Sequence, residues 1–190
     1  MKKLLLAIVL LYLPIAVFAD VTVNWLPQAG INYSWRSYDQ DADKKKPPIG
    51  FTGGVAAEVK LNSLFGVKAS LGISQIVIND RFSFDTYDNY GTITGSTWFE
   101  IKYEEYMAEF PVTGMAYFDP ADFLQVFMGL GIVPSYSTSN GYKTGFTAEC
   151  GIHLKAGMGK VTAGIAYIIY PNDMNFLNLN EVKVTIGYLF

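Results

Sequence analysis

Several segments of the chain alternate apolar and polar residues with a period of two, which is the pattern of β-strands with two different faces. The alternation is most regular in the last ten residues, 181–190. One face of this segment is entirely apolar and consists of Val182, Val184, Ile186, Tyr188 and Phe190. A tilted strand that crosses a bilayer needs about 9–11 residues with an apolar side toward lipid. The pattern therefore predicts a membrane-spanning final strand, and a soluble edge strand is the alternative.

The same alternation predicts seven further strands along the chain. They are residues 28–36, 51–61, 65–77, 99–118, 123–134, 144–155 and 161–169. Short turns at 62–64, 119–122 and 157–159 alternate with longer loops around 38–49, 79–98, 137–143 and 171–180. This asymmetry is typical of outer-membrane barrels, with the short turns on the periplasmic side and the long loops outside.

The apolar faces stay on the same side across each short turn. A slip of one residue would turn a whole strand inside out, so this agreement supports the assigned register. A turn centred on Ser63 places Glu58 opposite Lys68, and we expect an ion pair between them.

Residues 79–98 form a long polar and aromatic excursion, which we expect to extend its two flanking strands as a hairpin beyond the membrane. Phe99, Ile101 and Tyr103 have the opposite parity to the lower part of their strand. We therefore expect a bulge or a register change near Glu104 and Glu105.

The amino-terminal segment has the features of a secretory signal peptide. Lys2 and Lys3 precede an apolar run that Pro14 interrupts, and Ala19 provides a small residue at the break. We expect residues 1–19 to be removed and residues 20–190 to form one domain. An exported chain rich in apolar residues, with no further run apolar enough for a spanning helix, indicates a closed barrel, because closure satisfies every backbone group in lipid. The predicted fold is all-β, an eight-stranded antiparallel up-and-down transmembrane β-barrel.

Charge and cysteine content narrow the function. Without Lys2 and Lys3 the chain has 12 basic and 17 acidic residues, which argues against nucleic acid as a partner. The single cysteine, Cys150, cannot form an internal disulfide, and its parity places it toward lipid. We expect it to be an inert apolar residue.

Eight strands enclose an interior just wide enough to be filled by side chains. We expect a polar network that fills it and blocks diffusion, made by Glu58, Lys60, Lys68, Glu109, Glu149, His153 and Lys155.

Candidate chemistry is sparse, and we expect no catalytic residue, cofactor or metal site. His153 is the only histidine and faces inward near Thr162, so an enzyme of the lipid A acyl-modifying class would depend on it. Asp39, Asp41 and Asp43 have the spacing that opens a calcium loop, but Lys44 and Gly50 occupy the positions where glycine and glutamate are needed. A solvated loop is the preferred interpretation. Residues 44–46 are three lysines that could pair with lipid A phosphates.

Short motifs give a resemblance to a known family. They are A-G-I-N-Y-S at 29–34, G-F-T-G-G-V-A-A-E-V at 50–59, L-G-I-S-Q at 71–75, Y-M-A-E-F-P-V at 106–112, G-F-T-A-E-C-G-I-H-L-K at 145–155 and I-G-Y-L-F at 186–190. With them the chain resembles the PorT-like outer-membrane β-barrel family. The resemblance implies an eight-stranded barrel in the bacterial outer membrane, with no activity assigned to most members. It also implies that the barrel-assembly machinery reads the final strand through Ile186, Tyr188 and Phe190.

We predict a monomeric, non-enzymatic barrel with a structural or surface-interaction role, such as envelope integrity, adhesion or docking of an envelope protein. Its surroundings would be lipopolysaccharide and phospholipid. Binding or passage of a small hydrophobic ligand is the alternative, and an acyl-modifying enzyme is the third possibility.

Overall fold

The computed structural model of the chain describes residues 22–36, 48–88, 90–173 and 177–190. Its strands are β1 (Thr22–Arg36), β2 (Ile49–Lys60), β3 (Phe65–Tyr87), β4 (Ile93–Glu109), β5 (Val112–Ala121), β6 (Leu124–Ser137), β7 (Gly141–Ala156), β8 (Gly159–Asp173) and β9 (Leu177–Leu189). Within these residues there is no helix long and apolar enough to span a bilayer.

β4 and β5 together form one strand of the barrel wall. β3 pairs with both in a single register, because Gly72 lies opposite Glu109 and Ala69 lies opposite Val112. Pro111, between them, has no N–H to donate to a ladder. The wall therefore has eight strands, although nine segments are hydrogen-bonded along its sheet.

The sheet closes on itself. β1 pairs antiparallel with β2 on one side and with β9 on the other, and β2 also pairs with β3. The remaining wall strands pair in sequence through β6, β7 and β8 to β9. Each wall strand thus has a hydrogen-bonded neighbour on both sides, which confirms the predicted eight-stranded antiparallel barrel.

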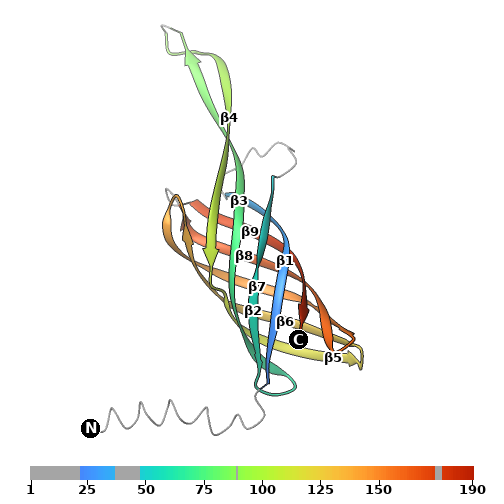
Figure 1. Cartoon of the computed structure of the whole chain (residues 1–190). Coiled ribbons are helices and arrows are strands. Elements are labelled where there is room, and N and C mark those ends of the chain that lie inside the picture. Colours follow the sequence, from blue (N-terminus) through green and yellow to red (C-terminus); the bar gives the residue numbers. More distant parts are fainter. Residues whose placement is uncertain (1–21, 37–47, 89, 174–176) are drawn as a thin grey trace, which may run out of the picture.

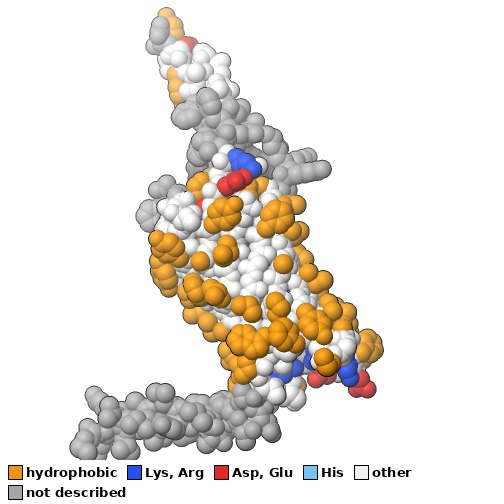
Figure 2. Space-filling model, in the orientation of Figure 1, with side chains coloured by type: hydrophobic (Ala, Val, Ile, Leu, Met, Phe, Trp, Pro, Cys, Tyr) orange, Lys and Arg blue, Asp and Glu red, His pale blue; other side chains and the backbone are white. Residues whose placement is uncertain are grey.

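The outer surface of the barrel is a belt of apolar side chains, and the visible charged ones gather near its two ends (Figure 2). The belt includes Val55, Leu71, Ile73, Met128, Leu130, Ile132, Ile165, Val184 and Ile186, all exposed. Aromatic rings line its margins: Trp35 stacks between Tyr33 and Tyr167 near one end, and Tyr188 stacks with Phe190 at the other. An apolar band between aromatic girdles is the arrangement of barrels that sit in lipid.

One end of the barrel, which we call the turn end, carries the short turns and the start of β1. Asn62 accepts hydrogen bonds from the backbone of Leu64 and Phe65, both at 2.8 Å, and so fixes the turn between β2 and β3. Gly157 adopts a φ of 62°, which favours glycine, in the two-residue turn between β7 and β8. The carboxyl end is fastened at this end as well, because the Phe190 and Trp25 backbones exchange hydrogen bonds of 3.0 and 2.8 Å.

At the opposite end, β3 and β4 continue as a two-stranded hairpin well beyond the other strands (Figure 1). We call residues 79–102 the arm. Its strands pair from Asn79 and Lys102 up to Tyr87 and Ile93. The tip is closed by the Asp88 carboxylate, which accepts hydrogen bonds of 2.8 Å from the backbone of Tyr90 and Thr92. The predicted hairpin is confirmed.

Two expectations need correction. The register of β3 with β4 runs without a shift past Glu104 and Glu105, so the expected bulge there is wrong, and the irregularity lies at Thr86 and Tyr87. The parity of the apolar residues reverses because the arm has left the lipid belt, and no extra residue is involved. The strands are also longer than predicted, with β1 starting at Thr22 and β3 ending at Tyr87. The predicted signal peptide, the aspartates at 39–43 and the lysines at 44–46 lie outside the described residues.

Depth in the membrane predicts the effect of a charge on the outer surface. Leu130→Arg, at a position 72% exposed in mid-strand, should destabilise the barrel by about 2–4 kcal/mol because lipid cannot solvate the guanidinium. Tyr142→Arg, at a position 70% exposed beside the β6–β7 turn, is the matched control and should have a small effect. Denaturant unfolding in lipid vesicles measures both, and equal losses would contradict a lipid-facing belt.

Candidate functional site

A buried group of charges occupies the middle of the barrel interior. The Lys183 amino group, on β9, pairs with Glu109 on β4 and lies 3.5 Å from Glu181. Ser74 also contacts this group, accepting from Lys183 at 2.7 Å and donating to Glu109 at 2.8 Å. The Tyr170 hydroxyl donates to the second Glu109 oxygen at 2.9 Å. These contacts join strands from opposite parts of the wall.

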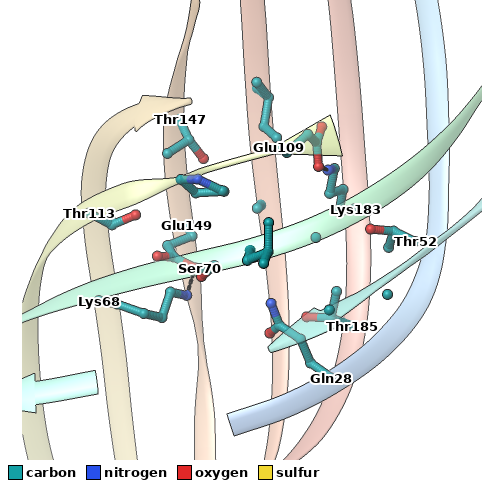
Figure 3. A pocket seen from close by; sticks show the side chains of 17 residues that line it. Gln28, Thr52, Lys68, Ser70, Glu109, Thr113, Thr147, Glu149, Lys183 and Thr185 are labelled. Atoms are coloured by element: carbon teal, nitrogen blue, oxygen red, sulfur yellow. Dashed lines mark hydrogen bonds and ion pairs between the residues drawn. The ribbon is translucent and has the colours of Figure 1, made fainter. Parts of the chain in front are cut away.

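Lys68 and Glu149 form a second ion pair (Figure 3). It lies nearer the turn end, because Lys68 is close to the start of β3. Between the two pairs is a cavity of about 60 Å³, lined mostly by polar side chains such as Thr52, Ser70 and Thr147. This volume holds a few water molecules. It is well below the roughly 300 Å³ or more of typical small-molecule pockets.

His153 is 1% exposed and lies below the second pair. Its Nδ1 is 2.8 Å from the Thr162 hydroxyl, and its ring stacks on Phe127 with centroids 4.6 Å apart. Its Nε2 lies 3.7 Å from a Glu58 carboxylate oxygen. The surrounding cavity is only about 20 Å³. The histidine is thus packed into the interior, with space beside it for a water molecule and not for a substrate.

The interior is closed by apolar layers above and below the charges. Toward the arm, the layer consists of Ile76, Ile78, Met107, Val133, Ile168, Tyr170 and Leu179. Toward the turn end, two smaller groups contain Met115, Tyr117 and Phe127, and Leu26, Ala56 and Leu189. Apolar side chains therefore close the lumen on both sides of the central cavity.

The base of the arm is tied to the β6–β7 turn. The Glu105 carboxylate, which is buried, accepts a hydrogen bond from Ser137 and lies 3.6 Å from the Lys143 amino group. Tyr103 and Asn140 donate to the same carboxylate at 3.1 and 3.3 Å. These bonds fix the direction in which the arm leaves the barrel.

Most of the residues predicted to fill the lumen lie there, but their partners differ from the expectation. Glu58 does sit opposite Lys68 in the ladder, yet Lys68 pairs with Glu149 and Glu58 lies beside His153. The expected Glu58–Lys68 ion pair is therefore wrong, because the long lysine side chain reaches a carboxylate on a different strand. Lys60 lies half-buried at the turn end, and Lys155 is exposed there and makes no contact with the predicted network.

Sequence reasoning left out several members of the interior. The sequence pattern assigns no role to Glu181 and Lys183, and it does not single out Asn32, Ser74, Glu105, Gln125 and Tyr170. Inward parity was the available signal for most of them. Parity does not give the height at which each side chain meets its partner across the lumen.

The arrangement provides no evident catalytic or cofactor geometry within the described ranges. No group of three histidine, cysteine, aspartate or glutamate side chains could hold a metal ion there. Cys150 is exposed on the outer surface, as its parity predicted. The last-strand residues Ile186, Tyr188 and Phe190 also face outward.

Comparison with solved structures shows which class of proteins shares this fold. No protein family and no curated protein matches the sequence. The crystal structure of Neisserial surface protein A (NspA) is similar, with a TM-score of 0.59 and 11% sequence identity over 90% of this chain and 97% of that one. Outer membrane protein OprG from Pseudomonas aeruginosa is similar with a TM-score of 0.51 and 9% identity, over 88% of this chain and 95% of that one. The chain thus has the fold of the small outer-membrane β-barrels.

The central charges give a stability prediction. Lys183→Met leaves Glu109 and Glu181 buried without their cation, so we expect a loss of about 3–5 kcal/mol in the free energy of unfolding. Lys183→Met combined with Glu109→Gln should lose less than the single variant, because an unpaired carboxylate is removed.

Lys102→Met is the matched control for this prediction, since Lys102 pairs with Glu104 on the exposed surface. Chemical unfolding in detergent measures all three variants. A Lys183→Met barrel as stable as Lys102→Met would contradict a structural role for the buried pair.

Proposed function

We propose that the protein is a non-enzymatic barrel of the bacterial outer membrane that holds the arm outside the cell as an interaction element. In this proposal the signal peptide is removed, the barrel-assembly machinery inserts the chain through its last strand, and the barrel acts as a monomer. Membership of the PorT-like family belongs to the same proposal and rests on the sequence motifs alone.

The main observation behind the proposal is that β3 and β4 extend far beyond the other strands, while the lumen below them is closed by side chains. β3 has 23 residues, whereas a tilted crossing needs about 9–11. The excess of about ten residues extends on the order of 30 Å past the belt, at about 3.3 Å per residue. Transport does not require this extension, and side chains close this barrel. Presentation of an element at the surface does require it.

The arm is built to be held out stiffly. β3 and β4 pair without a register shift from the base of the arm to Thr86, and at the base Glu105 is fixed to the β6–β7 turn. Its described tip residues are exposed, including Tyr87, Ile93 and Tyr90, the last at 93%. Exposed aromatic side chains on a rigid support are the residues that protein interfaces favour.

The two other candidate functions find less support. A hydrophobic ligand would need a pocket large enough to hold it, and the central cavity has a volume of only about 60 Å³. An enzyme would need substrate to reach His153, and that ring is buried against Phe127 and Thr162.

Photo-crosslinking at the arm tip tests the proposal. A benzoylphenylalanine in place of Tyr90 should give a discrete covalent adduct on intact cells, because the tip contacts a partner. The same replacement at Tyr142, which is exposed beside a short turn, is the control and should give none. Absence of an adduct at position 90, or equal adducts at both positions, would contradict an interaction role for the arm.

Conductance tests the filled lumen. The purified barrel in a planar bilayer should show no steady open level, because two ion pairs and three apolar groups occupy its interior. A general porin reconstituted in the same way shows that the assay detects a pore. A stable current step that scales with salt would contradict the sealed interior.

A further inference from the structure

Three lysines gather at the turn end of the barrel, and none of them forms an ion pair with a carboxylate of the described residues. Lys60 ends β2, Lys155 lies at the end of β7 and Lys160 lies at the start of β8. The ion pairs among the described residues involve other lysines, namely Lys68, Lys102, Lys143 and Lys183. The charges of Lys60, Lys155 and Lys160 are therefore not neutralised by direct pairing with a described carboxylate.

Two of these amino groups converge on one neutral oxygen. Lys60 Nζ lies 2.8 Å and Lys160 Nζ 3.1 Å from Oε1 of Gln125, a buried residue on β6. The amide is oriented by Asp119, which accepts a hydrogen bond of 2.7 Å from Gln125 Nε2. Two like charges are thus held beside each other by a group that cannot neutralise them.

Lys155, the third lysine, adds a further positive charge at the same place. Lys155 lies directly opposite Lys160 in the β7–β8 ladder, and like charges in that position repel each other. Two acids, Asp119 and Glu58, lie near Lys60, but neither forms an ion pair with these lysines in the described part of the chain: Asp119 accepts from Gln125, and Glu58 lies 3.7 Å from the His153 ring. Lys60 is also 4.6 Å from the centre of the Tyr117 ring, which attracts a cation without cancelling its charge.

We propose that this mouth of the barrel binds a phosphate group. Each ammonium has three donors, and at most part of that capacity is used by Gln125. A phosphate offers several acceptor oxygens and up to two negative charges, so one group can bridge Lys60 and Lys160 and attract Lys155 through charge-assisted hydrogen bonds. The burial gradient, from buried Gln125 to exposed Lys155, leaves the site open to the aqueous end.

A charge-relocating variant tests the proposal most sharply. Gln125→Glu with Asp119→Asn places a carboxylate where the two lysines converge and keeps the side-chain shapes and the net charge. The lysines then have an internal partner. Titration of the full barrel in nonionic detergent with inorganic phosphate, by calorimetry at low ionic strength, should show saturable binding for the natural chain and at least tenfold weaker binding for this variant.

Single substitutions complete the test. Lys160→Gln should also weaken phosphate binding at least tenfold, whereas Lys102→Gln, at the base of the arm, should leave it within twofold. Heat-modifiable migration on gels verifies that each variant is folded. The proposal is overturned by absence of saturable binding in the natural chain, by unchanged binding in the charge-relocating variant, or by an equal loss in Lys102→Gln.

The source of the phosphate is assigned in a second arm of the experiment. Short-chain phosphatidylglycerol, added to the natural chain, should displace inorganic phosphate if a lipid headgroup is the occupant. If it does not compete, the occupant is a free phosphate from the aqueous side. Both outcomes require the lysine-dependent binding of the first arm.

Discussion

The structure depends on the need of every backbone N–H and C=O in hydrocarbon for a partner within the protein. Pairing of β1 with β9 meets this need by removing the two edges that an open sheet would expose to lipid. Pro111 is one of the wall residues that have no N–H to donate, and it interrupts the strand ladder. The interruption falls between β4 and β5 without changing the register on either side, so closure is kept.

Closure has a consequence for the interior. An eight-stranded barrel has little room, and the inward faces carry charges that cannot be solvated by bulk water. They are stabilised by pairing across the lumen, as Lys183 pairs with Glu109 and Lys68 with Glu149. These pairs link strands that are not adjacent in the sheet. The belt of lipid-facing side chains and the cross-linked interior are therefore two results of the same alternation.

The arm shows where that alternation stops being dictated by lipid. Within the barrel the outward positions of β3 and β4 are apolar, as at Leu71, Ile73 and Tyr106. Beyond the belt the ladder continues in the same register, but Lys102 and Glu104 occupy outward positions and form an ion pair. The change of parity marks the level at which the solvent changes from hydrocarbon to water.

Much of this fold could be predicted from the sequence, because period-two patterning determines which side of a strand faces lipid and turn geometry determines neighbouring registers. The opposition of Glu58 and Lys68 followed from one turn centred on Ser63. The pattern does not contain distances across the lumen. It therefore predicts neither the pairing of Lys68 with Glu149 nor the place of Lys183 among the buried charges. The expected bulge near Glu105 came from assuming that apolar residues must always face outward, which holds only inside the belt.

The central claim is that alternate residues of these strands face lipid while their neighbours fill a closed interior. A nitroxide scan along β9, from residue 182 to residue 189 in a Cys150→Ala background, tests it in lipid vesicles. Collision with oxygen, which is concentrated in hydrocarbon, should peak at the outward positions 184, 186 and 188. A water-soluble nickel complex should reach neither these outward positions nor the inward positions 183 and 185 in mid-strand. Loss of the two-residue period, or free access of the nickel complex to 183 and 185, would contradict the account.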